Sequence, residues 1–354
     1  MRACAQGTLP ASLRLVAHID HCLGCQACEA VCPSQVPYAR LLQDGRALLR
    51  AKTRPGLRAR LARLLVRATN SPALVLWGYR LARIAQALGL LPLLGEPLAT
   101  GLRDLPSRAR VRPMRTTLTH GPAAALFTGC TADLDRETLN AALRLLAAVG
   151  EPVNLPPSQG CCGALARHAG WADIAARQEH RNREAFAGAS AVITTASGCA
   201  AALRLADREG PFPPVFDIHR YLLAKTAIAE VRFRPWAGTI AVHSPCSLRN
   251  ALRGAQDVPA LLALIPEARI VPLAQSGCCG AAGDHFLREP ARAQALADKT
   301  LAELATLKPD IVVSANIGCA LHLAAALRRQ GHDLPIVHPL LVLARQLPSP
   351  DGPC

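Results

Sequence analysis

Fourteen cysteines are the residues of this chain whose type and spacing could do chemistry. Four of them form a compact run near the amino terminus, followed directly by Pro33: Cys22, Cys25, Cys28 and Cys32. Their spacing is the C-x2-C-x2-C-x3-C-P pattern of bacterial ferredoxins, in which soft thiolates bind iron. This ferredoxin run therefore predicts a [4Fe–4S] cluster, with a zinc site of four cysteines as the alternative.

The ferredoxin run occurs once in this sequence. In ferredoxins with two clusters, the fourth cysteine of each run binds the other cluster. In that arrangement Cys32 would point to a cluster whose other ligands are absent, and Cys4 or a thiol of a partner could fill the vacancy. A truncated chain and a genuine loss of a second run are both open explanations.

Eight further cysteines occur as two copies of one pattern, in which a single cysteine, an adjacent pair and a last cysteine follow one another. The first copy consists of Cys130, Cys161, Cys162 and Cys199, and the second of Cys246, Cys278, Cys279 and Cys319. The copies are offset by 116, 117 and 120 residues, and GCCGALARHAG in the first matches GCCGAAGDHF in the second. We interpret them as one unit that has been duplicated.

The elements that must position these cysteines follow from the hydrophobic pattern. From about residue 116, short apolar runs such as AAALF, AVITTA, GTIAVH and DIVVSA alternate with amphipathic segments such as DRETLNAALRLLAAVG and CALHLAAALRR. This alternation predicts an α/β fold with parallel sheets covered by helices. In each copy the first cysteine follows a predicted strand, the pair lies on a glycine-flanked loop, and the last cysteine opens a helix.

Parallel strands bring their carboxyl-end loops to one crevice, so the four thiols of each copy are expected to meet there. Gly163 and Gly280 allow the close backbone approach that a cluster needs. The helix amino termini beside Cys199 and Cys319 favour thiolates. Iron–sulfur clusters are favoured over zinc, whose ligands usually come in short C-x2-C knuckles, and over metal-free redox thiols.

Composition sets the broad class of protein. With 354 residues, 51% of them hydrophobic, the chain can bury two cores of ordinary size. No amino-terminal stretch has the pattern of a signal peptide, and no apolar run reaches the about 18 residues of a membrane span. Two adjacent Cys-Cys pairs also argue against disulfides. We expect a reduced, cytoplasmic, metal-binding chain.

The net charge of +15 is concentrated in one block. Residues 40–115 contain 16 Lys or Arg against three acidic residues, a net of +13, so the other 278 residues sum to +2. The block is predicted to be helical and amphipathic, with leucines between Arg58, Arg60, Arg63 and Arg67. It indicates a solvated connector, or a docking surface for an acidic protein or an anionic membrane. Nucleic acid is not expected as a partner, because no aromatic-rich or zinc-finger pattern accompanies the charge.

Together these motifs resemble the iron–sulfur subunit of bacterial glycolate oxidase. The iron–sulfur subunits of lactate utilisation, of anaerobic glycerol-3-phosphate dehydrogenase and of heterodisulfide reductase (its B subunit) are similar. The resemblance covers the ferredoxin run, the segment PSQVPYARLL after it, and both cysteine copies across 125–325. It implies ferredoxin motifs joined to two tandem cysteine-rich "CCG" α/β domains, whose eight cysteines hold one or two further [4Fe–4S] clusters.

Two departures from this resemblance bear on function. The family normally carries two ferredoxin runs, and this sequence shows only the one that resembles the second. The heterodisulfide reductase type ends each CCG domain with C-x2-C, which gives five thiols for a non-cubane cluster. Ala196 and Asn316 occupy those positions here, which speaks against that cluster and against disulfide-cleaving chemistry.

No flavin, nicotinamide or nucleotide motif is found, so FAD is expected on a partner chain. The resemblance implies an electron-transfer subunit of a 2-hydroxy-acid (glycolate or lactate) dehydrogenase complex. Electrons would pass from the flavoprotein to a quinone or another acceptor, in the cytoplasm or at the inner face of the cell membrane. The rival interpretations are a heterodisulfide-reductase-like subunit that reduces a disulfide at a CCG cluster, and a zinc module with a structural role.

Four segments are expected along the chain: a ferredoxin-type segment at 1–50, a basic helical connector at 51–115, and CCG domains at 116–232 and 233–354. His285 and His322, close to the second Cys-Cys pair and to Cys319, are expected to be ligands, to tune a cluster through hydrogen bonds, or to be ordinary lining residues. His18 and His21 are expected on the surface.

Overall fold

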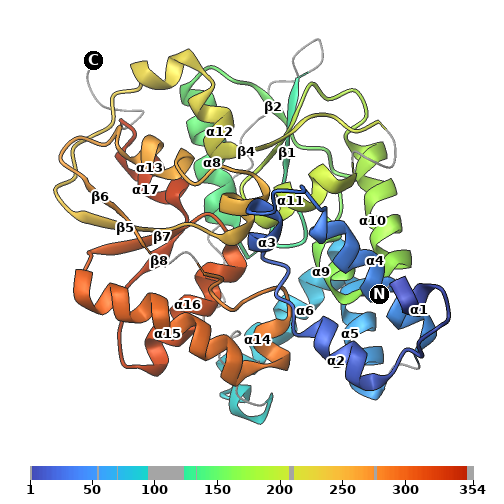
Figure 1. The fold of residues 1–354 in the computed structure, drawn as a ribbon. Helices are drawn as coiled ribbons and strands as arrows, with labels where there is room; N and C mark the ends of the chain where they lie inside the picture. The colour runs from blue at the N-terminus through green and yellow to red at the C-terminus, as the bar shows by residue number, and fades with distance from the viewer. Residues whose placement is uncertain are drawn as a thin grey trace.

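The computed structural model describes residues 2–53, 56–69, 71–94, 123–132, 134–206, 211–274 and 277–348. Figure 1 shows two α/β units side by side, with a set of helices from the amino-terminal part packed against them. The two units contain one four-stranded sheet each. The prediction of an α/β fold with parallel sheets is confirmed.

The first sheet has the strand order β2-β1-β3-β4, and every neighbouring pair is parallel. Its strands are β1 (Ala124–Phe127), β2 (Val153–Asn154), β3 (Val192–Thr194) and β4 (Val215–Asp217). The helices of this unit are α8 (Arg136–Ala148), α9 (Ala164–Ala169), α10 (Ala172–Ala185), α11 (Ser197–Ala206), α12 (Ile218–Leu223) and the 3-10 helix η3 (Thr226–Glu230).

The second sheet repeats this order as β6-β5-β7-β8, again wholly parallel. Its strands are β5 (Thr239–His243), β6 (Arg269–Pro272), β7 (Ile311–Ser314) and β8 (Ile336–Val337). Its helices are the π-turn η4 (Ser247–Ala251), α13 (Asp257–Leu262), α14 (His285–Arg288), α15 (Pro290–Leu307), α16 (Ile317–Arg329) and α17 (Pro339–Gln346). The identical strand order supports the duplication that the cysteine pattern predicted.

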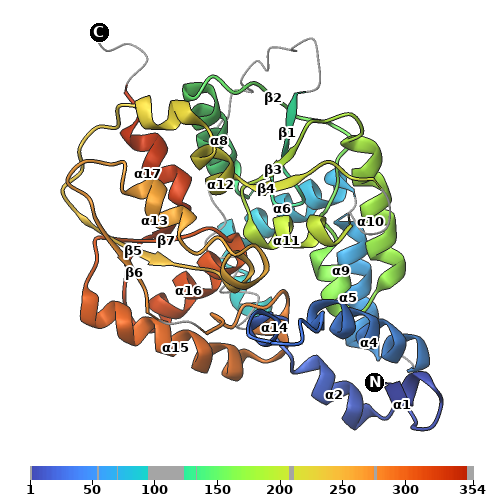
Figure 2. The same ribbon diagram turned by 45° about the horizontal axis from the view of Figure 1, so that its top comes forward.

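The central strands are buried because helices cover both faces of each sheet. All residues of β1 and of β7 are buried, which explains their continuous apolar sequences. One hydrophobic cluster runs through both units, from Ala124 to Leu347. Helix α17 of the second unit packs on α8 of the first, and Figure 2 shows the two helices close together. The two repeats therefore share a core.

The amino-terminal part is helical: α1 (Arg2–Ala5), α2 (Leu13–Asp20), α3 (Ala27–Ala30), α4 (Tyr38–Lys52), α5 (Leu57–Ala68), α6 (Pro72–Ala87) and the 3-10 helix η1 (Leu91–Leu94). Helices α4 and α5 pack on α9 of the first unit. The predicted helical character of the basic connector is confirmed up to residue 94, and its residues 95–115 lie outside the described residues. None of the described helices is long and apolar enough to cross a membrane.

Candidate functional site

The first copy of the cysteine pattern forms one group at the carboxyl ends of the strands of the first sheet. Cys130 follows β1, the Cys161–Cys162 pair lies on the loop before α9, and Cys199 lies in the first turn of α11. The Cys161 thiol interacts with those of Cys130 and Cys162, and Cys162 interacts in turn with Cys199. These four residues are called the first thiol group below.

The second copy has the same arrangement. Cys246 follows β5, the Cys278–Cys279 pair lies on the loop before α14, and Cys319 lies in the first turn of α16. Cys278 interacts with Cys246 and Cys279, and Cys279 with Cys319. Residues about 70 positions apart thus meet in each repeat. The second thiol group is formed by these four residues.

One thiol in each group has a pKa below the ordinary value of cysteine. Hydrogen bonds from Cys130 and Cys162, together with the backbone of Gly163, hold the pKa of Cys161 well below its ordinary value. Hydrogen bonds from Cys246 and Cys279 lower the pKa of Cys278 to about 3. The thiolate is the form of cysteine that binds metals.

The surrounding thiols show the opposite shift. Interaction with the central thiolate, followed by burial, raises the pKa values of Cys130 and Cys246, and interaction with two neighbouring thiols raises those of Cys162 and Cys279. Each group would therefore release protons on binding metal, since all four sulfurs must then be thiolates.

Glycines let the Cys-Cys loops run against a neighbouring helix. Gly280 has φ +99°, and a Cβ there would lie 2.5 Å from the backbone oxygen of Ala293 on α15. Gly163 has φ +82°, but its nearest neighbour would be Gln178 Oε1 at 3.5 Å. A Cβ at Gly163 would also lie 3.7 Å from the backbone oxygen of Ala175 on α10, so the first loop packs less tightly against its helix than the second.

The first loop is also held by polar side chains. Asn182 on α10 is fully buried, accepts a hydrogen bond from Gly160 N at 2.9 Å and donates one to Cys161 O at 2.8 Å. The Thr69 hydroxyl, at the end of α5, reaches the Cys161 thiol, and Gln178 Nε2 donates to Thr69 Oγ1 at 3.3 Å. The basic connector thus contributes a hydroxyl to the first thiol group.

The ferredoxin run is fixed by contacts with three other parts of the chain. Arg46 on α4 is buried and donates to the backbone oxygens of Cys22 at 2.6 Å and Ile19 at 3.2 Å. His168 on α9 lies 3.4 Å from Leu23 O, and Asn250 on η4 donates to Cys25 O at 2.7 Å. The run therefore lies between the two α/β units.

This placement brings Cys25 to the second thiol group. Burial raises the pKa of Cys25, and the charges of Cys278, Cys22 and Cys28 raise it further. Cys22 and Cys28 are exposed, and Cys32, which follows α3, is partly exposed. Cys4 is instead buried in a small apolar cluster with Val16 and Leu49.

The donor set fits an iron–sulfur cluster, whose ligands are cysteine thiolates. All thirteen described cysteines are free thiols, and in each thiol group four sulfurs gather beside backbone that a glycine allows to approach closely. The sulfurs are neighbours in pairs: among the described residues, no group of three or more His, Cys, Asp or Glu is placed to hold one metal ion.

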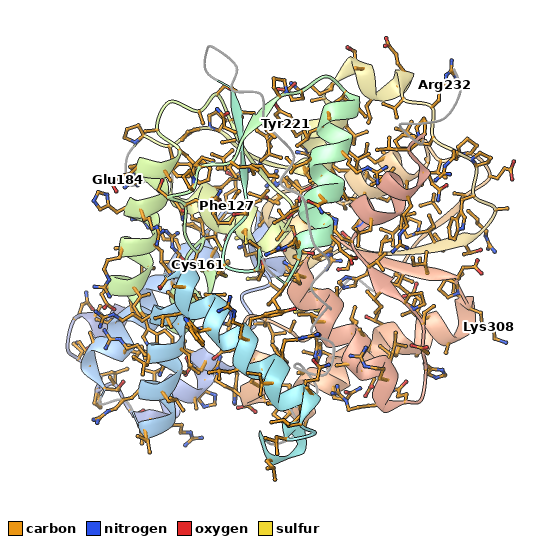
Figure 3. The ribbon with its side chains drawn as sticks, turned by 180° about the vertical axis from the view of Figure 1, so that it is seen from behind. Phe127, Cys161, Glu184, Tyr221, Arg232 and Lys308 are labelled. Atoms are coloured by element: carbon orange, nitrogen blue, oxygen red, sulfur yellow. The ribbon has the colours of Figure 1, made fainter. Side chains whose placement is uncertain are left out.

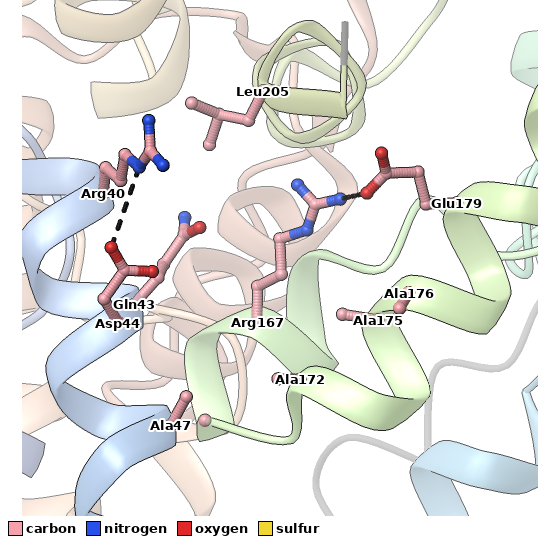
Figure 4. Close-up of a pocket in the computed structure, with 11 residues that line it drawn as sticks. Arg40, Gln43, Asp44, Ala47, Arg167, Ala172, Ala175, Ala176, Glu179 and Leu205 are labelled. Carbon is pink, nitrogen blue, oxygen red and sulfur yellow. Dashed lines mark hydrogen bonds and ion pairs between the residues drawn. The ribbon is translucent and has the colours of Figure 1, made fainter. Parts of the chain in front are cut away.

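A separate cavity of about 260 Å³ lies between α4 and helices α9–α11 (Figure 4). Its charged residues pair with one another: Arg167 forms a buried ion pair with Glu179, and Arg40 lies 3.7 Å from Asp44. No cysteine lines it. No sequence pattern pointed to this cavity, because its residues come from distant helices.

The histidine predictions can be compared with the structure. His322 is buried, and its Nε2 lies 3.2 Å from Ala293 O, so it is a satisfied polar group beside the second thiol group. His285 is buried, and its Nε2 has no hydrogen-bond partner among the described residues. His18 and His21 are exposed, as predicted.

Comparison with known proteins places these features in a family. The family model "Cysteine-rich domain" matches residues 124–204 and 240–324, which lie within the two α/β units and include all eight cysteines of the two thiol groups. The glycolate oxidase iron–sulfur subunit of Escherichia coli is 30% identical, over 89% of this chain and 80% of its own length. The chain belongs to the glycolate oxidase iron–sulfur subunit family.

Other members and relatives agree with this assignment. The probable glycolate oxidase iron–sulfur subunit of Bacillus subtilis is 28% identical over 94% of this chain and 82% of its own length. One subunit of the fumarate reductase (CoM/CoB) of Methanothermobacter marburgensis is 30% identical, over 60% of this chain and 43% of that protein. Like the glycolate oxidase subunits, this chain is therefore an iron–sulfur protein with two cysteine-rich repeats.

Proposed function

We propose that this chain is the electron-transfer subunit of a flavin-dependent 2-hydroxy-acid dehydrogenase, with glycolate or lactate as substrate of the complex. A partner subunit carries FAD and delivers electrons, and a quinone or another acceptor receives them, in the cytoplasm or at the inner face of the cell membrane. The observation that carries the proposal is the gathering of eight cysteines into two thiol groups, with Cys25 beside the second.

The proposed ligands are the twelve cysteines of the three sets. Cys22, Cys25, Cys28 and Cys32 would hold a ferredoxin-type [4Fe–4S] cluster; Cys130, Cys161, Cys162 and Cys199 a second cluster; and Cys246, Cys278, Cys279 and Cys319 a third. When bound, each cluster supplies a one-electron redox centre. The corresponding domain organisation is 1–50, 51–115, 116–232 and 233–354.

The arrangement of the three sites supports a relay. The charge of Cys278 acts on Cys25, and Asn250, four residues after Cys246, donates a hydrogen bond to Cys25 O at 2.7 Å, so the ferredoxin run lies near the second thiol group. The hydroxyls of Ser197 and Ser247 are 2.8 Å apart across the contact between the two repeats. Ser197 lies two residues before Cys199, and Ser247 directly follows Cys246. These contacts support a relay in which electrons pass among the three proposed sites.

Reconstitution with a flavoprotein tests this function. The purified chain alone should not reduce a dye with glycolate or lactate, whereas addition of the flavoprotein subunit of a 2-hydroxy-acid dehydrogenase should give acid-dependent dye reduction through this chain. Cys278→Ser should abolish the gain, and Cys4→Ser, which changes a buried cysteine outside the proposed sets, should retain it. Equal dye reduction with and without this chain would contradict the proposal.

The alternative is a subunit that itself reduces a disulfide at a CCG cluster. Ala196 and Asn316 stand where a fifth thiol would be needed for it. Asn316 instead caps α16, where its side chain accepts a hydrogen bond from Gly318 N at 3.0 Å. Disulfide cleavage by the chemically reduced chain, without any flavoprotein, would favour this alternative.

A further inference from the structure

The most unusual surface of the described chain is the outer face of α5, α6 and η1. Eleven of the eighteen exposed large apolar side chains lie between residues 57 and 93: Leu57, Leu61, Leu64, Leu65, Leu74, Trp77, Leu81, Ile84, Leu88, Leu90 and Leu93. Figure 3 views the molecule from the side on which α6 and η1, drawn in cyan, lie outermost. Such a concentration of exposed apolar side chains marks an interaction site.

The spacing of these residues makes a stripe on each helix. On α5, Leu57, Leu61 and Leu64 are separated by four and three residues, and on α6 the residues from Leu74 to Leu88 follow the same rule. The opposite faces bind the protein: Val66 packs with Ala166 and Ile174, and Tyr79 is buried. Both helices thus bury one apolar face and expose another.

The charged residues of this stretch itself have a single sign, and one of them, Arg63, pairs with Asp173 of α10 at 2.9 Å. Between residues 57 and 94 the ionisable side chains of Asp, Glu, Lys and Arg are six arginines and nothing else. Arg67 is exposed on α5, and the Arg80 guanidinium carbon lies 5.4 Å from the ring centroid of exposed Trp77. Arginine beside tryptophan, next to a leucine stripe, is the composition of a helix that lies in a membrane interface.

We propose that α5, α6 and η1 dock this subunit onto the surface of an anionic lipid bilayer. The leucine stripes enter the boundary between headgroups and acyl chains, and the exposed Arg67 and Arg80 contact the anionic headgroups. An anionic lipid surface is favoured because the exposed leucines and Trp77 would leave water for the apolar part of the bilayer, and because no acidic residue between 57 and 94 would be repelled by the headgroups.

This docking also orients the redox sites. Thr69 at the end of α5 reaches the Cys161 thiol, so the first thiol group lies directly behind the docking face. If the proposed function holds, the first thiol group is the one nearest to an acceptor dissolved in the bilayer. The lipid binding does not depend on the proposed function; only the inference about the electron acceptor rests on it.

Vesicle co-sedimentation tests the docking with the anaerobically purified full chain. The chain should sediment with vesicles of equimolar phosphatidylglycerol and phosphatidylcholine, not with pure phosphatidylcholine, and about 0.5 M sodium chloride should weaken the binding. Replacing Leu61, Leu81 and Leu88 by Gln should lower binding at least about tenfold. Leu13→Gln, at a leucine on α2 that is even more exposed than these three, is the control and should bind normally.

Trp77 supplies an independent readout. Its emission should shift to the blue on adding the anionic vesicles and be quenched by brominated lipid, and Trp77→Phe should remove both effects. Trp171 and Trp236 are packed against the protein core and should not respond.

Three results would overturn the proposal. The wild-type chain could fail to bind anionic vesicles, or the triple Gln variant could bind as well as the wild type. Alternatively, the wild-type chain could fail to bind vesicles while the triple Gln variant weakens another interaction. Dissociation of a dimer of this chain would assign the face to a second copy, and loss of a bound flavoprotein would assign it to that partner. Iron and sulfide content should be equal in all variants. Loss of lipid binding alone would therefore not contradict the proposed electron-transfer function. Loss of iron with intact lipid binding would contradict that function but not the docking.

Discussion

The two thiol groups have the same cysteines on the same strand order, but different surroundings. The first is held by polar side chains from outside its sheet, Asn182 and Thr69. The second is held by backbone packing at Gly280 and has Cys25 beside it. Hydrogen bonds to sulfur and exposure to solvent set the potentials of iron–sulfur clusters. Duplication therefore preserved the ligands, while the different surroundings predict two different redox centres.

The largest expected effect comes from the glycines. Gly280→Ala should destabilise the chain by about 4 kcal/mol or more, because the new Cβ would collide with the Ala293 backbone oxygen and a positive φ is strained for alanine. Gly163→Ala should cost only about 1–2 kcal/mol, the strain alone. Anaerobic urea unfolding measures both, and equal losses would contradict the different packing of the two loops.

A second prediction concerns the junction between the repeats. His338 Nε2 lies 2.8 Å from Thr195 O, and burial, followed by the charge of His219, lowers the His338 pKa from 6.5 to about 3. Below pH 6.5 the His338 side chain is protonated in the unfolded chain but stays neutral in the folded chain. The free energy of unfolding therefore falls as the pH decreases from 6.5 towards 3. This contributes about 1.4 kcal/mol per pH unit within that window.

The contribution of His338 can be isolated by substitution. In His338→Gln the slope of unfolding free energy against pH, between pH 6 and about 4, should be smaller by that amount. Unfolding at a series of pH values measures it. An unchanged slope would mean that His338 is not the group that resists protonation.

Asn182→Ala should affect the first thiol group selectively. It leaves Gly160 N and Cys161 O without their partners in a buried place, which costs about 3 kcal/mol. The matched change on the other side is Asn250→Ala, which removes one partly buried hydrogen bond to Cys25 O and should cost about 1 kcal/mol. Urea unfolding gives the two energies, and a larger loss for Asn250→Ala would reverse the comparison.

The smallest effect is a shift of potential at the first group. Thr69→Val keeps the shape and removes the hydroxyl that reaches Cys161, so it should lower the potential of one centre. A hydrogen bond that differs by about 1 kcal/mol between redox states shifts a one-electron potential by roughly 40 mV. Redox titration followed by EPR measures the shift, and Thr69→Ser should restore the original potential. If Thr69→Val changed the reduction potential of no centre, the Thr69 hydroxyl would not act on a redox site.

Much of the fold could be predicted because short-range sequence patterns indicate its main strands and its repeats. The apolar runs at 123–127, 191–196 and 238–243 became β1, β3 and β5, and the repeated cysteine spacing indicated the two units. The strands β2 and β4 were not predicted, since two or three residues carry too weak a pattern. Their place in the sheet is decided by pairing with distant strands.

The contacts around the cysteines could not be predicted in the same way. Asn250 is 225 residues from the Cys25 carbonyl that it binds, and Thr69 belongs to a segment that looked like a connector. Neither residue has a sequence feature that points to its partner. The sequence did indicate that α5 is amphipathic, but burial of Val66 decides which face is turned to solvent.

Iron and acid-labile sulfide per chain, measured after anaerobic purification with EPR of the dithionite-reduced sample, test the central claim most directly. Three sites of four cysteines predict about twelve irons in near-equal amount with sulfide, together with signals of reduced clusters. Cys278→Ser and Cys25→Ser should each remove about four irons if their sites are independent. Zinc without acid-labile sulfide would contradict the electron-transfer function.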